Sequence, residues 1–414
     1  MLLTRIRHWG IHALASCCLL FSAAAQTSGE GGIGPDPSSQ PTLGKAGEGH
    51  LGMQLGFFNT SDSPGDGNPF LDEALTVIEP VIVYDYNVTD RLNVGAKLSY
   101  DLVSSASIDR LSEYGNGEQS GASGDNYVGS DFNFLYQKNR DWTLGGHLGA
   151  SFEYDYFSLG FGLNAAQDLK NADATLSYSL DVYQDTVDII RYDGTQDEGE
   201  ESRTSISASF NWYQILSPKS HGTFGVTLAQ QDGFLETPYN GVVVEGPNTA
   251  TAPPFHNGAI GREYQEELPD SRSRVALYGR VLNSLGRGHA WEMGGRLYTD
   301  SWGVNSVTVE PRYIVSLVED KLDLRLRYRY YTQTAADDFG EHFSALDADS
   351  PSASELPGER TQDSDLGAYD AHTVGTKWTW FLAQEDTFTL NLDYTLRSDG
   401  LDQIFASVAY IWSF

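Results

Sequence analysis

Beyond residue 25, this 414-residue sequence contains no cysteine. Its only cysteines, Cys17 and Cys18, lie in the first 25 residues. The rest of the chain therefore has no disulfide, no thiol nucleophile and no thiolate metal site. That part also has no run of 18 apolar residues, which excludes a transmembrane helix there.

Positive charge is scarce as well. Lys and Arg number 26 against 57 Asp and Glu, and the formal net charge is −31. We therefore predict no nucleic-acid partner, because binding the phosphate backbone relies on a surplus of basic side chains. By contrast, Gly (43), Tyr (23) and Phe (19) are abundant.

The first residues have the pattern of a secretory signal peptide. Arg5 and Arg7 precede an apolar stretch that ends in "LLFSAAAQT". The three alanines before Gln26 offer an A-x-A cleavage site, so we predict a signal peptide over residues 1–25.

Two further assignments concern the N-terminal region. The stretch "LASC" resembles a lipoprotein cleavage box, but the apolar run continues past Cys17, so the lipoprotein reading is the weaker alternative. Residues 26–49 are rich in Gly, Pro and Ser, and we predict a flexible periplasmic segment there. The remaining residues, 50–414, form the predicted folded unit.

Apolar and polar residues alternate along most of residues 50–414, and period two is the signature of a β-strand with two unlike faces. Large aromatic side chains are frequent on the apolar parity, and Ser, Thr, Asn, Gly and charged residues occupy the other. A soluble β-sandwich is the alternative explanation for such strands. The sixteen predicted strands cover about 50–60, 73–88, 91–104, 130–138, 141–153, 156–167, 173–185, 203–216, 221–231, 272–284, 289–300, 304–316, 321–333, 369–382, 386–398 and 401–414.

The connections between these strands favour a membrane barrel over a sandwich. Short turns such as "NVTDR" and "SPKS" alternate with longer segments, as in outer-membrane barrels. We therefore predict an all-β, transmembrane antiparallel barrel of about 16 strands, with short periplasmic turns and long extracellular loops. The five long loops are expected near 61–72, 105–129, 186–202, 232–271 and 334–368.

The C-terminal stretch "IFASVAYIWSF" supports the same assignment. Tyr410, Trp412 and Phe414 share one parity, and the last residue is aromatic. Such an ending resembles the signal by which bacterial barrel proteins are recognised for insertion into the outer membrane. We accordingly predict the bacterial outer membrane as the location and the barrel-assembly machinery as a partner.

The stretch "KLDLRLRYRYY", residues 321–331, assigns the two faces of a strand. Leu and Tyr take one parity, whereas Arg325, Arg327 and Arg329 take the other. Charge on the lipid face of a barrel costs about 2–4 kcal/mol at mid-membrane, so we predict that these arginines point into the lumen.

The same parity argument applied to neighbouring strands predicts a basic wall on one side of the lumen. It faces four acidic residues on the same strands, Glu292, Asp300, Glu310 and Asp323. Two explanations are compatible: a ladder of Arg–carboxylate pairs that stiffens the barrel, or a transverse field that sorts small ions in an aqueous channel. The predicted wall consists of Arg272, Arg274, Arg280, Arg296, Arg312, Arg325, Arg327 and Arg329.

The five long loops are strongly acidic. Their basic residues are Arg110, Arg191, Arg262 and Arg360 alone. Solvation of loop tips explains such charge, and carboxylates also provide ligands for divalent cations shared with lipopolysaccharide phosphates. The stretch "SDSPGDGNPFLD" lacks the spacing of a calcium loop, so we assign no metal site.

Catalytic motifs are absent from the sequence. It has no Gly-x-Ser-x-Gly, His-Glu-x-x-His or phosphate-binding loop, and its histidines have no metal-ligand spacing. We predict no enzyme activity and no cofactor. The stretch "DGFLETPY" opens the longest loop, and its Asp232, Glu236 and Tyr239 suit either ligand binding or anchoring of that loop.

Several stretches resemble a family of uncharacterised bacterial barrel-like proteins, the domain-of-unknown-function family 3570. The most specific are "SSASID" (104–109), "DGFLETPY" (232–239) and "DSWGVNS" (300–306), within a resemblance that spans most of residues 75–414. The resemblance implies the barrel and supplies no substrate.

Taken together, the sequence predicts a porin-like outer-membrane channel for small solutes or ions with a basic lumen wall, in contact with outer-membrane lipid and lipopolysaccharide. The alternative is a barrel scaffold or receptor for a periplasmic or extracellular partner, for example a redox protein. An outer-membrane lipid-modifying enzyme is a third hypothesis.

Overall fold

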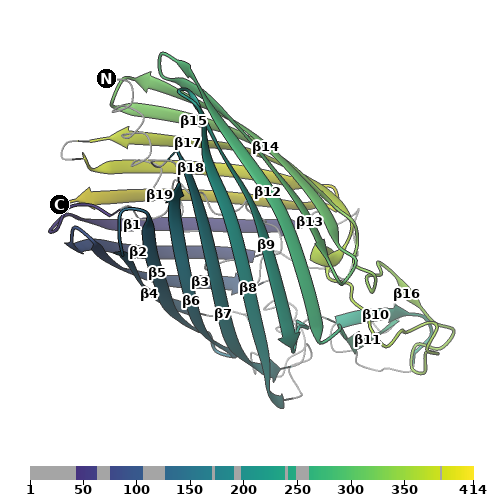
Figure 1. The fold of residues 1–414 in the computed structure, drawn as a ribbon. Helices are drawn as coiled ribbons and strands as arrows, with labels where there is room; N and C mark the ends of the chain where they lie inside the picture. Colours follow the sequence, from purple (N-terminus) through teal and green to yellow (C-terminus); the bar gives the residue numbers. More distant parts are fainter. Residues whose placement is uncertain are drawn as a thin grey trace.

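The computed structural model describes residues 43–62, 75–105, 126–169, 173–190, 197–237, 241–248, 261–382 and 385–414. Sixteen strands form one closed barrel in which each strand is hydrogen-bonded to the next along the chain, and β1 closes the ring against β19 (Figure 1). The barrel strands are β1 (Gly49–Asp62), β2 (Leu75–Thr89), β3 (Leu92–Ser105), β4 (Asn126–Gln137), β5 (Trp142–Phe152), β6 (Tyr156–Leu169), β7 (Ala174–Ile190), β8 (Asp197–Ser217), β9 (Ser220–Gly233), β12 (Ser271–Gly286), β13 (His289–Asp300), β14 (Asn305–Val318), β15 (Leu322–Gln333), β17 (Tyr369–Phe381), β18 (Thr387–Arg397) and β19 (Leu401–Ser413).

Each of the sixteen segments predicted from alternation overlaps one of these strands, so the predicted all-β closed barrel is confirmed. Differences are confined to the ends of strands. The largest is at β8, which begins at Asp197, whereas the alternation is regular only from about residue 203. Backbone pairing with β7 continues through this extension, although the sequence "DEGEES" has no apolar parity.

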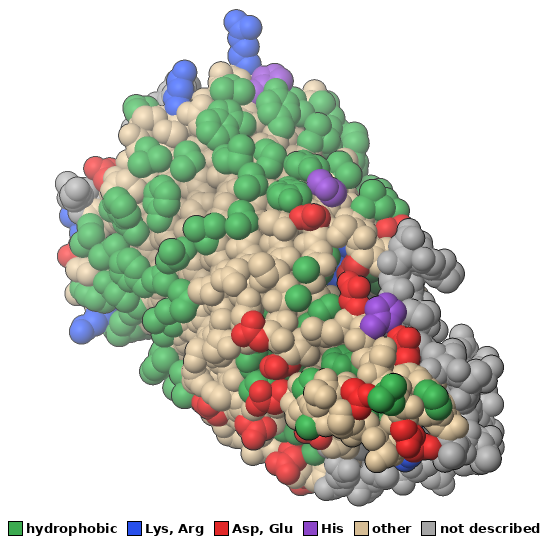
Figure 2. Space-filling model, turned by 90° about the vertical axis from the view of Figure 1, so that its right-hand side faces the viewer, with side chains coloured by type: hydrophobic (Ala, Val, Ile, Leu, Met, Phe, Trp, Pro, Cys, Tyr) green, Lys and Arg blue, Asp and Glu red, His purple; other side chains and the backbone are tan. Residues whose placement is uncertain are grey.

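The two parities of the strands have very different environments. On the apolar parity of β15, Leu326 is 44% exposed and Tyr328 is 41% exposed. On the polar parity of the same strand, Arg329 is only 5% exposed. Large apolar side chains are exposed on every barrel strand described, and Figure 2 shows many of them on the upper part of the face in view. The polar parity therefore faces the interior.

Closure of the barrel joins the two ends of the folded unit. The register of β1 and β19 runs from His50 opposite Ser413 to Asp62 opposite Leu401 without a shift. Backbone hydrogen bonds between Gly49 and Phe414 extend the pairing by one step, at N–O distances of 2.7 and 3.0 Å. The antiparallel ring thus leaves no free edge strand, which is what stabilises a barrel against edge-to-edge association.

Three short strands form a separate sheet that the sequence did not predict. Strands β10 (Gly241–Glu245), β11 (Gly261–Gln265) and β16 (Phe343–Ser344) lie within the segments predicted as the long loops 232–271 and 334–368. The sheet lies at the end of the barrel opposite the C-terminus (Figure 1). Strands of two to five residues are too short to produce a periodic signal in the sequence.

A small apolar cluster links these segments to the barrel rim. It comprises Leu268, Trp302, Val304, Ala336 and Leu366, with Phe339 packed against it. Leu366 belongs to the short 3₁₀ helix η4 (Ser364–Leu366). Among the residues that the structure describes, no helix is long and apolar enough to cross a membrane.

Candidate functional site on the inner face of the barrel

A row of paired residues crosses five neighbouring strands on the inner face. Glu292 of β13 is paired with Arg312 of β14, and Arg312 with Arg327 of β15. Arg327 is paired in turn with Gly375 of β17, and Gly375 with Asp393 of β18. Directly opposed residues in a sheet project from the same face, so two arginines and two carboxylates lie side by side. We call Glu292, Arg312, Arg327, Gly375 and Asp393 the charged row.

Ion pairs connect the first half of the charged row. Arg312 Nη1 lies 2.8 Å from Glu292 Oε1, and a second ion pair joins Arg312 to Glu310. Arg280 of β12 approaches Glu292 as well, with 3.4 Å between Nε and Oε1. Both carboxylates are buried, and a buried carboxylate is tolerated because cations compensate its charge.

The second half of the row is joined through Arg327. Its Nη2 lies 3.1 Å from Glu310 Oε2, and its Nη1 lies 3.4 Å from Asp393 Oδ1, two strands away. Gly375 makes that reach possible, because a Cβ there would come within 1.7 Å of Asp393 Oδ1. A glycine at this position therefore leaves the space through which β15 and β18 share an ion pair.

Two other arginines of the predicted wall do not take part in this network of ion pairs. In the part of the chain that the structure describes, Arg274 and Arg325 form no ion pair with a carboxylate, and the Nε of each is buried without a hydrogen-bond partner. Arg325 is paired in register with Lys377 of β17, which places two cationic residues next to each other. This part of the wall thus carries positive charge that neighbouring carboxylates do not contact.

Aromatic rings accompany two more of the arginines. The guanidinium carbon of Arg296 lies 5.8 Å from the ring centroid of Tyr298, and that of Arg329 lies 5.5 Å from the ring of Tyr331. In both cases the tyrosine is two positions further along the same strand, so it projects from the same face. The inner surface of this wall is therefore basic and aromatic.

All eight arginines predicted for the wall lie on the parity that faces the interior, and the structure brings them onto four adjacent strands, β12 to β15. Arg280, Arg312 and Arg327 belong to the ion-paired network, and Arg272 is paired with Asp300 at the loop end. A role of these side chains in a solute pathway stays a prediction.

A second cluster faces the interior from the other side of the ring, and the sequence analysis missed it. His147 of β5 lies between two carboxylates, with Nδ1 2.8 Å from Asp131 Oδ2 and Nε2 3.0 Å from Asp181 Oδ1. Gly162 lies beneath the imidazole, where a Cβ would come within 2.0 Å of Nε2. The sequence does show that all four residues occupy inward, polar positions of consecutive strands. Which of them meet depends on the register between those strands, which the sequence pattern does not give.

The described residues of the stretch "DGFLETPY" hold the start of the long loop against residues at its end. Gly233 adopts φ +113°, and a Cβ there would lie 2.1 Å from the carbonyl oxygen of Ser202. Asp232 accepts a hydrogen bond from the hydroxyl of Ser271 at 2.9 Å, and Glu236 accepts one from the backbone of Leu268 at 3.4 Å. These contacts favour loop anchoring over ligand binding, while Tyr239, the third predicted residue, lies outside the described residues.

The stretch "DSWGVNS" forms a comparable anchor at the turn between β13 and β14. Asp300 Oδ1 accepts hydrogen bonds from the backbone N–H groups of Trp302 and Val304, both at 3.0 Å. Its Oδ2 lies 2.5 Å from Arg272 Nη2, and the guanidinium of Arg272 lies 4.2 Å from the ring centroid of Trp302. The third family stretch, "SSASID", lies mostly outside the described residues.

The residues predicted as an insertion signal lie where β19 meets its neighbours. Tyr410 donates a hydrogen bond to Asp386 Oδ2 at 2.8 Å, and its ring contacts that of Trp412. The ring of Phe414 stacks against those of Tyr84 and Tyr86, with centroid distances of 6.3 and 6.4 Å, and the two tyrosine rings lie 6.3 Å from each other. These aromatic groups form part of a belt at the short-turn end, and their recognition by the assembly machinery stays a prediction.

At the loop end, Asp363 caps the helix η4. Its Oδ1 accepts a hydrogen bond from the backbone N–H of Asp365 at 2.9 Å. Burial raises the pKa of the Asp363 carboxyl above its usual value, and the nearby charges of Asp365 and Glu266 raise it further.

Comparisons with known proteins bear on the fold and the family. No curated protein matches the chain. Among solved structures, OccK1 (OpdK) of Pseudomonas aeruginosa is 9% identical, with a TM-score of 0.41 over 89% of this chain and 98% of that one. The CymD monoaromatic hydrocarbon channel is 10% identical, with a TM-score of 0.42 over 89% of each chain. A bacterial polysaccharide outer membrane secretin is 8% identical, with a TM-score of 0.47 over 88% of this chain and 98% of that one.

These identities and TM-scores are too low to transfer a function. The match to a family model is of another kind, because it extends over nearly the whole sequence, from residue 15 to residue 404. That family is described as proteins of unknown function, DUF3570, and the chain belongs to it.

Proposed function

We propose that this protein is an outer-membrane β-barrel that provides a pathway for small solutes or ions past a basic inner wall. The observation that supports it best is the contrast between the two faces of one closed sheet. The outer face exposes large apolar side chains on all sides, and the inner face carries a network of arginines and carboxylates.

The outer face is suited to lipid. Soluble monomers rarely expose continuous apolar patches above a few hundred Å², and here such side chains encircle the barrel. A closed barrel also satisfies the backbone hydrogen bonds of every spanning strand internally, as a bilayer requires. Together with the predicted signal peptide and the aromatic C-terminus, these features favour the outer membrane.

The inner face is suited to water and to charged solutes. A barrel of 16 strands has room for an aqueous interior. Charge that no carboxylate contacts, at Arg274 and Arg325, would attract anions and repel cations of similar size. We therefore propose anion preference for the pathway.

Single-channel recording in planar lipid bilayers tests this function. The purified barrel is expected to give discrete conductance steps with anion preference in a salt gradient. The double variant Arg274→Gln, Arg325→Gln should shift the reversal potential toward cations, because it removes two lumen charges without leaving a paired carboxylate alone. Lys138→Gln, at an exposed position in the turn after β4, is the matched control and should leave selectivity unchanged.

A folded barrel that gives no conductance would contradict the pathway. The scaffold or receptor and the lipid-modifying enzyme would then remain, and a lipid-hydrolysis assay on the same preparation would separate those two.

A further inference from the structure

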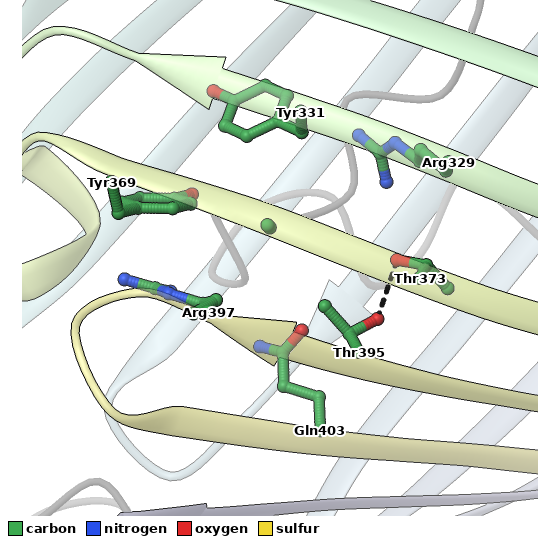
Figure 3. A pocket seen from close by; sticks show the side chains of 8 residues that line it. Arg329, Tyr331, Tyr369, Thr373, Thr395, Arg397 and Gln403 are labelled. Carbon is green, nitrogen blue, oxygen red and sulfur yellow. Dashed lines mark hydrogen bonds between the residues drawn. The ribbon is translucent and has the colours of Figure 1, made fainter.

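A small cavity lies in the barrel wall near the loop end, between β15, β17, β18 and β19 (Figure 3). Its volume is about 20 Å³ for a water-sized occupant, enough for one water molecule or one ion of similar size. The cavity is bounded by Arg329, Tyr369, Thr373, Thr395, Arg397 and Gln403.

The hollow exists because a small residue stands among large ones. Ala371 of β17 is paired with Tyr331 on one side and with Arg397 on the other. Ala371 lines the cavity together with the longer side chains of Tyr331 and Arg397.

One polar group in this cavity has no partner. Tyr369 is 4% exposed, and within the described residues its hydroxyl forms no hydrogen bond. The ring cannot turn away, because the guanidinium of Arg397 lies 3.8 Å from its centroid and the ring of Tyr331 lies 5.6 Å away. A buried hydroxyl without a partner costs about 1–3 kcal/mol, so an occupant that accepts its proton is expected.

The remaining lining identifies the charge of that occupant. No carboxylate lines the cavity, and the charged groups at its rim are arginines. Asp365 and Asp399, each 2.5 Å from a guanidinium nitrogen of Arg397, lie outside the lining. The hydroxyls of Thr373 and Thr395 form a hydrogen bond with each other at 2.8 Å (Figure 3). Only one of the two hydroxyl hydrogens is used in this bond, so the other hydroxyl can donate a hydrogen bond into the cavity or along the wall.

We propose that this cavity binds a small monovalent anion of halide size. The hydroxyl of Tyr369 donates a hydrogen bond to the anion, and Arg329 supplies the compensating charge. The site does not require that the barrel conducts, because the anion sits in the wall beside the lumen and can be detected by binding alone.

Bromide is the probe for this site. Crystals of the full barrel grown in sodium bromide should show a bromide anomalous peak in the cavity. In solution, replacing gluconate by bromide at constant ionic strength should raise the thermal unfolding midpoint of the detergent-solubilised barrel in a saturable way, because a ligand that binds only the native state stabilises it.

Two variants make the test specific. Tyr369→Phe keeps the ring and removes the unpartnered hydroxyl, so the barrel should fold normally while the apparent Kd for bromide rises about tenfold or more. Ala371→Leu fills the cavity and should abolish the saturable response. Val374→Ala on the outward face of β17 is the control and should retain it.

An equal response to bromide in the wild type and in both cavity variants would overturn the proposal, as would a crystal in which the cavity holds an ordered water only. If Tyr369→Phe fails to fold, Ala371→Leu and the anomalous map decide the question independently.

Discussion

Arg327 of β15 and Asp393 of β18 form an ion pair across an intervening strand, with 3.4 Å between Nη1 and Oδ1. They are able to meet because Gly375 of β17 lies between them in the register and has no side chain. The inner face of this barrel therefore has a continuous network that links strands which are not hydrogen-bonded neighbours.

Replacing Gly375 by Ala should destabilise the barrel by about 1–3 kcal/mol, the range for overpacking a filled site. The added Cβ would lie 1.7 Å from Asp393 Oδ1 and would push the carboxylate away from Arg327. The measurement is the urea midpoint of unfolding in detergent micelles. Gly295→Ala is the matched control, since the nearest atom to its added Cβ lies 3.6 Å away, and an equal loss in both variants would contradict the role of Gly375.

Glu310 should be the most sensitive carboxylate of the network. It contacts both Arg312 and Arg327, and removal of one partner from a buried pair typically costs about 3–5 kcal/mol. We expect Glu310→Gln to destabilise the barrel by an amount in that range.

A double-mutant cycle tests whether the cost comes from the ion pair. Arg327→Gln combined with Glu310→Gln should lose less stability than the sum of the two single variants, because the double variant leaves fewer uncompensated charges. Strict additivity of the two losses would argue that the pair is not coupled.

The closed barrel should resist SDS until it is heated. Unheated protein is expected to migrate as a compact species on SDS gels, and boiled protein is expected to migrate more slowly. The physical reason is that every strand is paired on both sides, including β1 with β19, so unfolding has no edge from which to begin. Identical migration before and after boiling would count against closure.

The loop that carries η4 should loosen as the pH rises. A raised carboxyl pKa means that the packed loop holds the proton more tightly than the open loop does. The resulting stabilisation is complete below the ordinary pKa of an aspartate and is lost as the pH rises through the raised value. Limited proteolysis within residues 334–368 should therefore become faster as the pH rises from the ordinary pKa of an aspartate to the raised pKa of Asp363.

Asp363→Asn should abolish most of this pH dependence, because asparagine retains the capping oxygen and has no charge to bury. Glu341→Gln, at an exposed position of the same loop, is the control and should behave like the wild type. Proteolysis that accelerates equally with pH in Asp363→Asn and wild type would assign the effect to another group.

The sequence determined the barrel because alternation is a local property. Each strand displays its two faces in its own residues, and the cost of charge in lipid assigns Arg325, Arg327 and Arg329 to the interior without knowledge of any neighbour. The number of barrel strands follows from the same local pattern, and each barrel strand is paired with the next barrel strand along the chain.

Only the tertiary structure decided which charges meet. Register between strands sets the partners of Arg312 and Arg327, and a shift of one residue would exchange every inward side chain for an outward one. The same holds for His147 and its two carboxylates, which come from three different strands and were unremarkable in the sequence. The cavity at Ala371 and the sheet of β10, β11 and β16 depend likewise on contacts between distant segments, which no local pattern specifies.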